Sequence, residues 1–299
     1  MGAGQTQYVA ALTPRGSGHQ LVFYGDCCSG IPGGKRESNF AQVNAVLRWL
    51  DPPPDFIVFL GDHIAGTPGD SDSIRAQWRH WLTNEMAWLD SDRIPLYHVT
   101  SNHDTFDVVS EHVWREVFPD IPCNGPPGQE GLSYWVRRDD LLLVMVNTSF
   151  SGLGGYGHVE CAWLDATLGA HADARYMIVA GHHPVFSVNG YDERPKWCIV
   201  QEEADAFWSV LVRHRALAYL CSHIIAFDVQ EHDGVLQICS GGAGTNFGPG
   251  GFMGEGEYHH FVQSALDAHQ FRLQTIDPEG RVRERHACPL RTQYPHGQK

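Results

Sequence analysis

Seven polar residues suited to metal binding stand directly after short apolar runs of the chain. In order they are Asp26, Asp62, Asn102, His103, Asp104, His182 and His223. Carboxylate and amide oxygens combined with imidazole nitrogens suit zinc, manganese or iron, in divalent or trivalent form. Each residue alone has a simpler explanation, because an Asp after a strand usually caps a turn and a lone His is usually hydrogen-bonded. As a set, they indicate a metal site.

The apolar runs before these residues predict the strands that must position them. These runs cover 21–24, 56–60, 96–99, 176–180 and 216–220. Segments with helical periodicity alternate with them, at 39–50, 74–89, 108–117, 160–168 and 201–212. Such alternation is typical of α/β proteins, in which ligands gather at the carboxyl ends of the strands. We therefore expect the seven polar residues to meet at one edge.

From residue 235 onward the helical periodicity fades and short strands dominate. Their predicted ranges are 235–239, 260–263, 271–276 and 281–285. We expect an α/β fold, a double β-sheet sandwich flanked by helices, as one domain over 19–290 between a flexible segment 1–18 and a tail 291–299. Gly- and Pro-rich stretches at 123–131, 184–195 and 241–256 either connect elements at the surface or shape a substrate site.

Charge and cysteine usage narrow the classes of partner. The 299 residues carry a formal charge of −14, which disfavours duplex nucleic acid as a partner. An anionic substrate would then be attracted locally, by metal cations. The sequence has no uninterrupted apolar stretch of about 18 residues, so it predicts no membrane-spanning helix. Eight cysteines at irregular spacing indicate reduced thiols, and we expect a soluble cytoplasmic protein whose oligomeric state stays open.

Five motifs in the middle of the chain resemble the five blocks of the calcineurin-like metallophosphoesterases, which read D-x-H, G-D, G-N-H-D/E, H and G-H-x-H. They are Gly25-Asp26-Cys27-Cys28, Gly61-Asp62-His63, Ser101-Asn102-His103-Asp104, Gly181-His182-His183-Pro184 and Cys221-Ser222-His223-Ile224-Ile225. Segments 241–244 and 259–261 also look like this family and its purple acid phosphatase branch. The resemblance implies an αββα sandwich that hydrolyses phosphoric mono- or diesters with metal-activated water, on a small-molecule substrate.

The resemblance also implies two metal positions that share Asp62. The second position is complete, with Asp62, Asn102, His182 and His223. The first keeps the carboxylates of Asp26 and Asp62 only, because Cys28 and Ile225 replace two histidines of the family. Cys28 is either a thiolate ligand or a buried small apolar residue, and His63 or water is a further candidate. The resemblance therefore implies that one or two ions of iron, manganese or zinc are bound.

In the purple acid phosphatase branch a Tyr completes the first position, and this chain has Ala65 there. His103 and Asp104 resemble the family pair in which the histidine donates a proton to the leaving group and the acid orients it. Two alternatives remain open: a module that binds metal or a partner without turnover, and a mononuclear iron enzyme with other chemistry.

Several aromatic residues and histidines are weaker candidates. Trp78, Trp81 and Trp88 lie at near-helical spacing and either line a cleft or pack in the core. Further candidates for substrate contact, on position alone, are His158, His183, Tyr191 and His259.

Overall fold

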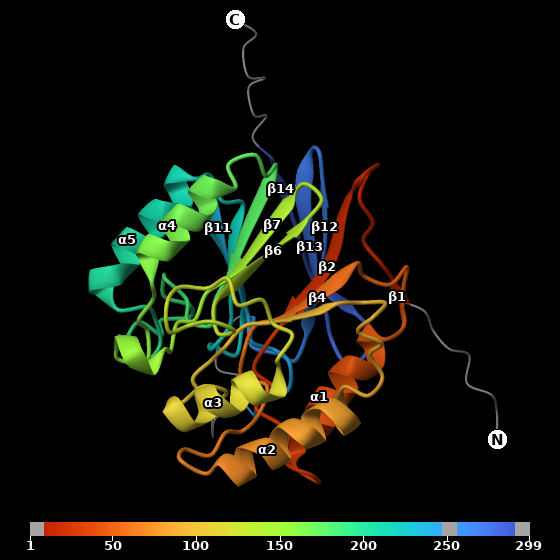
Figure 1. Cartoon of the computed structure of the whole chain (residues 1–299). Helices are drawn as coiled ribbons and strands as arrows, with labels where there is room; N and C mark the ends of the chain where they lie inside the picture. The colour runs from red at the N-terminus through yellow and green to blue at the C-terminus, as the bar shows by residue number, and fades with distance from the viewer. Residues whose placement is uncertain (1–8, 247–255, 291–299) are drawn as a thin grey trace, which may run out of the picture.

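Two six-stranded sheets pack face to face between two layers of helices in a computed structural model that describes residues 9–246 and 256–290 (Figure 1). Sheet I has the order β14 (Val282–Pro289), β13 (Gln270–Ile276), β12 (Phe261–Asp267), β2 (Gly18–Tyr24), β4 (Phe56–Phe59) and β5 (Leu96–His98). Sheet II has the order β10 (Phe227–His232), β11 (Val235–Ser240), β9 (Ala218–Cys221), β8 (Tyr176–Ala180), β7 (Leu141–Met145) and β6 (Tyr134–Arg138). A short parallel pair joins β1 (Val9–Ala10) to β3 (Leu50–Asp51).

The helices divide between the two outer faces of the sandwich. Sheet I is covered by α1 (Lys35–Leu47), α2 (Ser71–His80) with the π-helix η1 (Trp81–Glu85), and α3 (Val108–Val117). Sheet II is covered by α4 (Cys161–Ala170) and α5 (Gln201–Arg213), and a 3₁₀ turn, η2 (Ser151–Leu153), lies in the loop before α4. The αββα sandwich expected from the sequence is therefore confirmed. None of these described helices has the length and apolarity needed to cross a membrane.

Apolar side chains fill the space between the sheets and the space under each helical layer. Leu21 and Val58 of sheet I meet Leu143, Ile178 and Leu220 of sheet II in the central cluster. Strands in the middle of each sheet are buried on both faces, which explains why their sequences are continuous apolar runs instead of alternating ones. The polar residues that follow these runs mark the places where the strands leave the core.

Parallel pairing brings the ends of these strands to the same edge. In sheet I, β2, β4 and β5 are parallel neighbours. In sheet II, β7, β8, β9 and β11 are parallel neighbours. The two edges are joined by a hydrogen bond that His182 Nδ1–H donates to the Leu60 carbonyl at 2.8 Å, which fixes the two groups of strand ends relative to each other.

The predicted helix boundaries agree best with the structure where a capping box defines the start of the helix. The predicted helix 108–117 matches α3, where Asp107 and Ser110 form a reciprocal capping box. The predicted helix 74–89 is wrong in its second half, because the α-helix ends at His80 and a π turn follows. The helix predicted at 39–50 begins at Lys35 and ends at Leu47.

Of the strands in the two large sheets, β6, β7 and β10 were not predicted from the sequence, and neither was the short pair β1 and β3. The strands expected before residue 235 are apolar runs that end in candidate ligands, whereas β7 is followed by a further apolar residue, Val146. The extent of a single domain over 19–290 stays a prediction. Segments 1–8, 247–255 and 291–299 lie outside the described residues. They contain the predicted tail 291–299, the first eight residues of the predicted flexible segment 1–18, and most of the predicted 241–256 loop.

Candidate metal centre

The Asp62 carboxylate lies at the centre of the strand-end residues. Asp62 follows β4, is buried, and its N–H donates to Ser101 Oγ at 2.8 Å. Its φ of 56° is left-handed, as are those of Asp26 (64°), Cys28 (44°) and His223 (68°). Left-handed conformations of residues other than glycine cost energy and gather at functional sites. The backbone is thus strained where candidate ligands emerge from the sheets.

On one side of Asp62, two imidazoles lie close to its carboxylate and to each other. His182 Nε2 lies 3.3 Å from Asp62 Oδ1 and 3.1 Å from His223 Nδ1. One ligand atom from each of the three residues lies within 4.8 Å of the others, which is the spacing of ligands around one ion. The sequence-based expectation that these three residues come together is met by the geometry.

The other nitrogen of each ring is engaged by a backbone carbonyl. His182 Nδ1–H donates to Leu60 O at 2.8 Å, and His223 Nε2–H donates to Lys196 O at 2.7 Å. In the neutral imidazoles, the facing nitrogens therefore carry lone pairs toward each other and toward the Asp62 carboxylate. Three converging lone pairs repel unless a cation or a proton lies between them, and a carbonyl on the distal N–H is the usual arrangement of metal-bound histidine.

Asn102 adds an amide oxygen to the same edge. Its Oδ1 is buried and has no hydrogen-bond partner among the described residues. A buried polar atom without a partner costs free energy, so such an atom needs a bound ligand or water. The donor set of carboxylate, amide and two imidazoles therefore fits an ion of the iron, manganese or zinc class.

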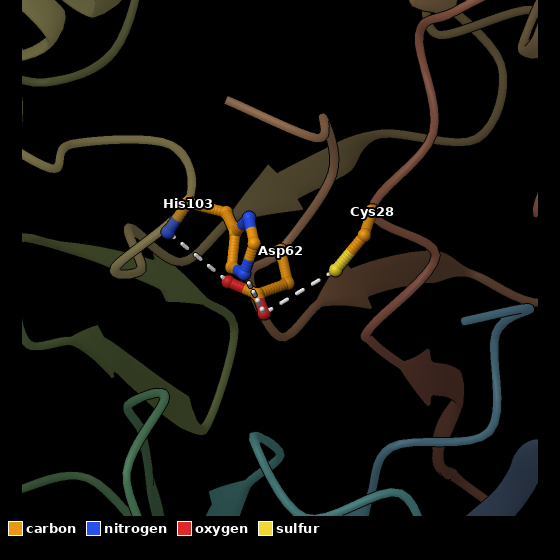
Figure 2. Close-up of side chains that lie close together, drawn as sticks. All are labelled: Cys28, Asp62 and His103. Carbon is orange, nitrogen blue, oxygen red and sulfur yellow. Dashed lines mark hydrogen bonds and ion pairs between the residues drawn. The ribbon is translucent and has the colours of Figure 1, made fainter. Parts of the chain in front are cut away.

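On the other side of Asp62, Cys28 and His103 approach its Oδ2 atom (Figure 2). Cys28 Sγ lies 3.5 Å from Oδ2, and His103 Nε2 lies 3.9 Å from it. His103 Nδ1–H donates to the Ala65 carbonyl at 2.6 Å, and the His103 amide donates to Asp62 Oδ1. The ring is thereby held with Nε2 facing the site.

Electrostatics differ between His103 and His223, which lie on different sides of Asp62. Burial raises the pKa of Asp62, but His182, His103 and His223 outweigh it in their protonated forms, which exist at acidic pH, and hold that pKa well below its usual range. The Asp62 charge raises the pKa of His103. Burial and the neighbouring His182 lower the pKa of His223 to about 4. The His223 imidazole is thus neutral at physiological pH, as a candidate ligand must be, whereas His103 retains a proton more readily.

Asp26 lies beside Asp62 but outside the two ligand clusters that contain Asp62. Its Oδ2 accepts hydrogen bonds from the Ser222 hydroxyl and from the His223 amide, the latter at 2.8 Å. Burial and then the Asp62 charge raise its pKa well above the usual value. Asp26, predicted as a metal ligand, therefore commits one oxygen to holding the His223 loop.

Asp104 does not take the orienting position that we predicted for it. Its Oδ2 accepts from His63 Nδ1–H and from Ser101 Oγ–H, both at 2.7 Å, and His103 instead uses the Ala65 carbonyl. Asp104 is fully buried and reaches His103 through its charge only. The adjacent residues His103 and Asp104 thus contact different groups, His103 in the site and Asp104 in the core.

His63, considered above as an extra ligand, belongs to the core. Its ring is fully buried, with centroids 5.2 Å from Trp78 and 5.1 Å from Trp81. Its Nε2 lies 3.1 Å from His98 Nδ1, on the side away from Asp62. The tryptophan stripe is likewise core packing for Trp78 and Trp81, which are fully buried.

Two further residues lie beside the candidate ligands, one not predicted from the sequence and one named on position alone. Tyr156, which no sequence motif marks, makes a hydrogen bond with the Asn102 side chain. It also lines a cavity of about 100 Å³ together with His103, Phe106 and the 65–68 segment. His183 is fully buried, its ring is 4.3 Å from His223, and its Nε2 has no partner among the described residues.

The other weak candidates are engaged elsewhere. His158 Nδ1 pairs with Glu203 at 2.8 Å, and Tyr191 packs on Trp197. His259 Nε2–H donates to the Thr245 carbonyl at 3.1 Å. The segment after the predicted 184–195 loop does contact the site, since it supplies the Lys196 carbonyl to His223.

Comparisons with known proteins agree with this geometry. A family model described as calcineurin-like phosphoesterase matches residues 19–227. Tartrate-resistant acid phosphatase type 5 of Oryctolagus cuniculus is 33% identical over 227 residues, which are 68% of this chain and 65% of that protein. Serine/threonine-protein phosphatase CPPED1 of Danio rerio is 27% identical over 198 residues, 62% of this chain and 58% of that protein. The chain thus spans less than two thirds of these relatives.

Two solved structures share the fold at low sequence identity. A purple acid phosphatase from yellow lupin (Lupinus luteus) seeds superposes with a TM-score of 0.67 at 12% identity, over 92% of this chain and 54% of that one. GAP50, described as the anchor in the inner membrane complex of Plasmodium, gives 0.64 at 14% identity, over 92% and 90%. Since the family model covers more than half of the chain, this protein belongs to the calcineurin-like phosphoesterase family, which is metal-dependent and whose relatives found here include phosphatases.

Proposed function

We propose that this protein hydrolyses phosphoric esters with one cation of the iron, manganese or zinc class. The cation would be held by Asp62, Asn102, His182 and His223, with His103 as proton donor. The observation that carries the proposal is the convergence of the His182, His223 and Asp62 lone pairs, with both distal ring nitrogens donating to carbonyls. Membership of a phosphoesterase family supplies the reaction class.

When bound, such a cation supplies Lewis acidity that polarises a phosphoryl oxygen and makes water a better nucleophile. The protein contributes the proton. His103 keeps Nδ1–H on the Ala65 carbonyl, so the proton that it can release is the one on Nε2, which faces the site. The Asp62 charge raises the pKa of His103, which keeps this proton available near neutral pH.

The departing oxygen of the ester would leave on the His103 side. The cavity of about 100 Å³ lined by His103, Phe106 and Tyr156 lies there and offers aromatic walls to a leaving group. A cavity of this size admits only a small part of a substrate, such as its leaving group, and the formal charge of −14 opposes duplex nucleic acid as a partner. A small-molecule phosphoester as substrate, with neither duplex nucleic acid nor membrane as partner, is part of the proposal.

A single cation is favoured over two by the Oδ2 side of Asp62. Ile225 has no ligand atom, and Asp26 already accepts two hydrogen bonds on one oxygen. Burial, then the charges of Asp62 and Asp26, raise the pKa of the Cys28 thiol, so that it is a neutral neighbour in the metal-free site. His103 then provides on this side the positive charge that a second cation would supply.

All eight cysteines are free, and five of them are buried. Reduced thiols in a chain of this length are typical of the cytoplasm, and we propose that compartment. Expression with a fluorescent tag in cells would test it, and retention in an oxidising compartment would contradict it.

The test of function combines metal analysis with a substrate panel. Protein loaded with iron, manganese or zinc is assayed on p-nitrophenyl phosphate and bis(p-nitrophenyl) phosphate, and its metal content is measured after dialysis. We expect about one strand-end ion per chain and turnover that His223→Ala abolishes. His158→Ala is the matched control, because that histidine pairs with Glu203 outside the ligand clusters.

Two other functions predict different results in the same assays. A module without turnover binds metal through the same residues and hydrolyses neither ester with any of the three metals. A mononuclear iron enzyme with other chemistry binds iron selectively and leaves both esters intact. Either result contradicts the hydrolase proposal.

A further inference from the structure

A second group of metal-binding side chains lies outside the strand ends, where α1 meets the end of α2. Glu37 stands in the first turn of α1, His80 ends α2, and Glu85 ends η1. One ligand atom of each lies within 4.8 Å of the others. His80 Nε2 is 2.7 Å from Glu37 Oε1 and 3.6 Å from Glu85 Oε1. None of the three belongs to the five blocks that carry the family resemblance.

The π turn is what brings Glu85 to His80. Residues five apart on a regular α-helix lie about 140° apart around the axis, so their side chains would diverge. In η1 the Met86 amide donates to the Trp81 carbonyl, five residues back, which widens the turn. Single π turns inside helices frequently mark functional sites. The local geometry therefore serves to place two ligands on one face.

Glu85 is a buried carboxylate with an unused oxygen. Its side chain is 3% exposed, and Oε1 accepts from Ser29 Oγ–H at 2.8 Å and from the Gly30 amide at 3.0 Å. Its Oε2 is buried and has no hydrogen-bond partner among the described residues. Burying a carboxylate oxygen without a donor is costly, and an adjacent cation removes that cost.

His80 is supported as a ligand by its other ring nitrogen. Its Nδ1 lies 2.8 Å from the Asn84 side-chain amide. Binding of a cation by Nε2 requires a proton on Nδ1, and a half-turn of the Asn84 amide presents the oxygen that accepts this proton. Such a partner on the distal nitrogen is the common support for metal-bound histidine.

A cavity of about 250 Å³ adjoins the cluster and is lined by both glutamates, Asn84 and Trp88. It gives a route for an ion and room for water to complete the coordination. Arg48 also lines the cavity, but its guanidinium lies over the Trp49 ring, 5.7 Å from the centroid. With neutral His80 the three ligands carry two negative charges, which a divalent cation balances.

We propose that Glu37, His80 and Glu85 form a second metal site that binds a divalent transition-metal ion, with zinc as its representative, independently of the strand-end centre. One imidazole with two carboxylates suits zinc, whereas calcium and magnesium prefer oxygen ligands alone. Three protein ligands leave one position of a tetrahedral ion for water. Bound metal joins α1 to η1 and, through Glu85, to the Ser29 hydroxyl and the Gly30 amide directly after Cys28.

Zinc stoichiometry of the full chain tests the site apart from the strand-end centre. Chelator-stripped protein is dialysed against micromolar Zn²⁺ and analysed for zinc, as wild type and as Glu85→Gln and His80→Gln. Both variants are expected to bind one zinc fewer per chain than wild type. In a His182→Ala/His223→Ala background one zinc remains, and adding Glu85→Gln removes it.

The control is Asp165→Asn, which breaks an equally short contact to His214 at 2.6 Å on the opposite helical layer and leaves the zinc count unchanged. Zinc should also raise the thermal unfolding midpoint of the double-alanine background, and not that of the same background with His80→Gln. Equal zinc counts in wild type, Glu85→Gln and His80→Gln would overturn the second site, whatever the esterase assays give.

Discussion

The two sides of the Asp62 carboxylate are built from similar residues but prepared for different chemistry. On the Oδ1 side, His182 and His223 have their distal ring protons engaged by carbonyls, so lone pairs face the carboxylate. On the Oδ2 side, His103 also has its Nδ1–H on a carbonyl, but its neighbour there is the Cys28 thiol and its pKa is raised.

The difference is a matter of what lies beside each imidazole. Two neutral imidazoles next to one carboxylate favour a cation between them, whereas a single imidazole next to a carboxylate is stable as an imidazolium. One carboxylate can therefore hold a metal ion on one oxygen and a proton donor on the other. The predictions below each separate these two roles.

Removing an Oδ1-side ligand should have the largest effect. We expect His182→Ala to lose the strand-end ion and to lower kcat/KM for phosphoric esters by about 1,000-fold or more, because the Lewis acid contributes several kcal/mol to the transition state. Metal analysis and steady-state kinetics check it. Retained metal with retained activity would show that His182 is not a ligand.

Removing the proton donor should cost less and depend on the leaving group. His103→Ala is expected to lower kcat about 100-fold for phenyl phosphate and much less for p-nitrophenyl phosphate, whose leaving group departs without protonation. The strand-end metal content should not change. An equal loss on both esters, together with loss of metal, would instead make His103 a ligand.

Asp104→Asn should act on stability more than on chemistry. Asp104 is fully buried and accepts hydrogen bonds from His63 and Ser101, and the second of these holds the Asp62 amide. We expect a loss of about 2–4 kcal/mol in the free energy of unfolding, measured by urea titration. If instead stability is unchanged and the His103-dependent step is lost, the orienting role first predicted for Asp104 would be restored.

Restoring the family histidines should add a cation to the Oδ2 side. The double variant Cys28→His/Ile225→His is expected to bind one more metal ion per chain than wild type, because two imidazoles then join the Asp62 carboxylate. Elemental analysis after dialysis checks this. An unchanged count would mean that residue 225 does not face this side.

Cys28→Ser should have the smallest effect. A neutral thiol that only neighbours Asp62 is replaced by a hydroxyl of similar shape, so we expect unchanged metal content and a change in kcat/KM within about threefold. Loss of metal in this variant would identify Cys28 as a thiolate ligand and remove the contrast between the two sides.

The sequence predicted which candidate ligands lie together better than it predicted their hydrogen-bond partners. The proximity of Asp62, His182 and His223 was predictable because each follows a buried strand, and parallel strands end at one edge. The neighbours His103 and Asp104 could not be assigned, since adjacent loop residues point in directions that only tertiary contacts decide. Tyr156 stands in a glycine-rich segment without periodicity, so nothing local connects it to Asn102.

Strand prediction failed for a related reason. Residues 141–145 form an inner strand of sheet II, but no candidate ligand follows them, so they were not predicted as a strand. The π turn after His80 was also invisible, because its residues have ordinary helical propensity and the widening depends on packing. The local sequence pattern thus reveals which segments are buried. Which side chains become hydrogen-bond partners, and where a helix widens into a π turn, depends on contacts that exist only in the folded chain.

The aromatic surroundings of His63 give the protein an optical probe of its own. Trp78 packs edge-on to Trp81 and Trp114 at 6.0 and 5.5 Å, and rigid indoles in a chiral setting give strong near-ultraviolet circular dichroism. His63 connects this cluster through Asp104 to the Ser101 hydroxyl that holds Asp62. The near-ultraviolet spectrum should therefore report, without any label, whether the loop that presents the central carboxylate is intact.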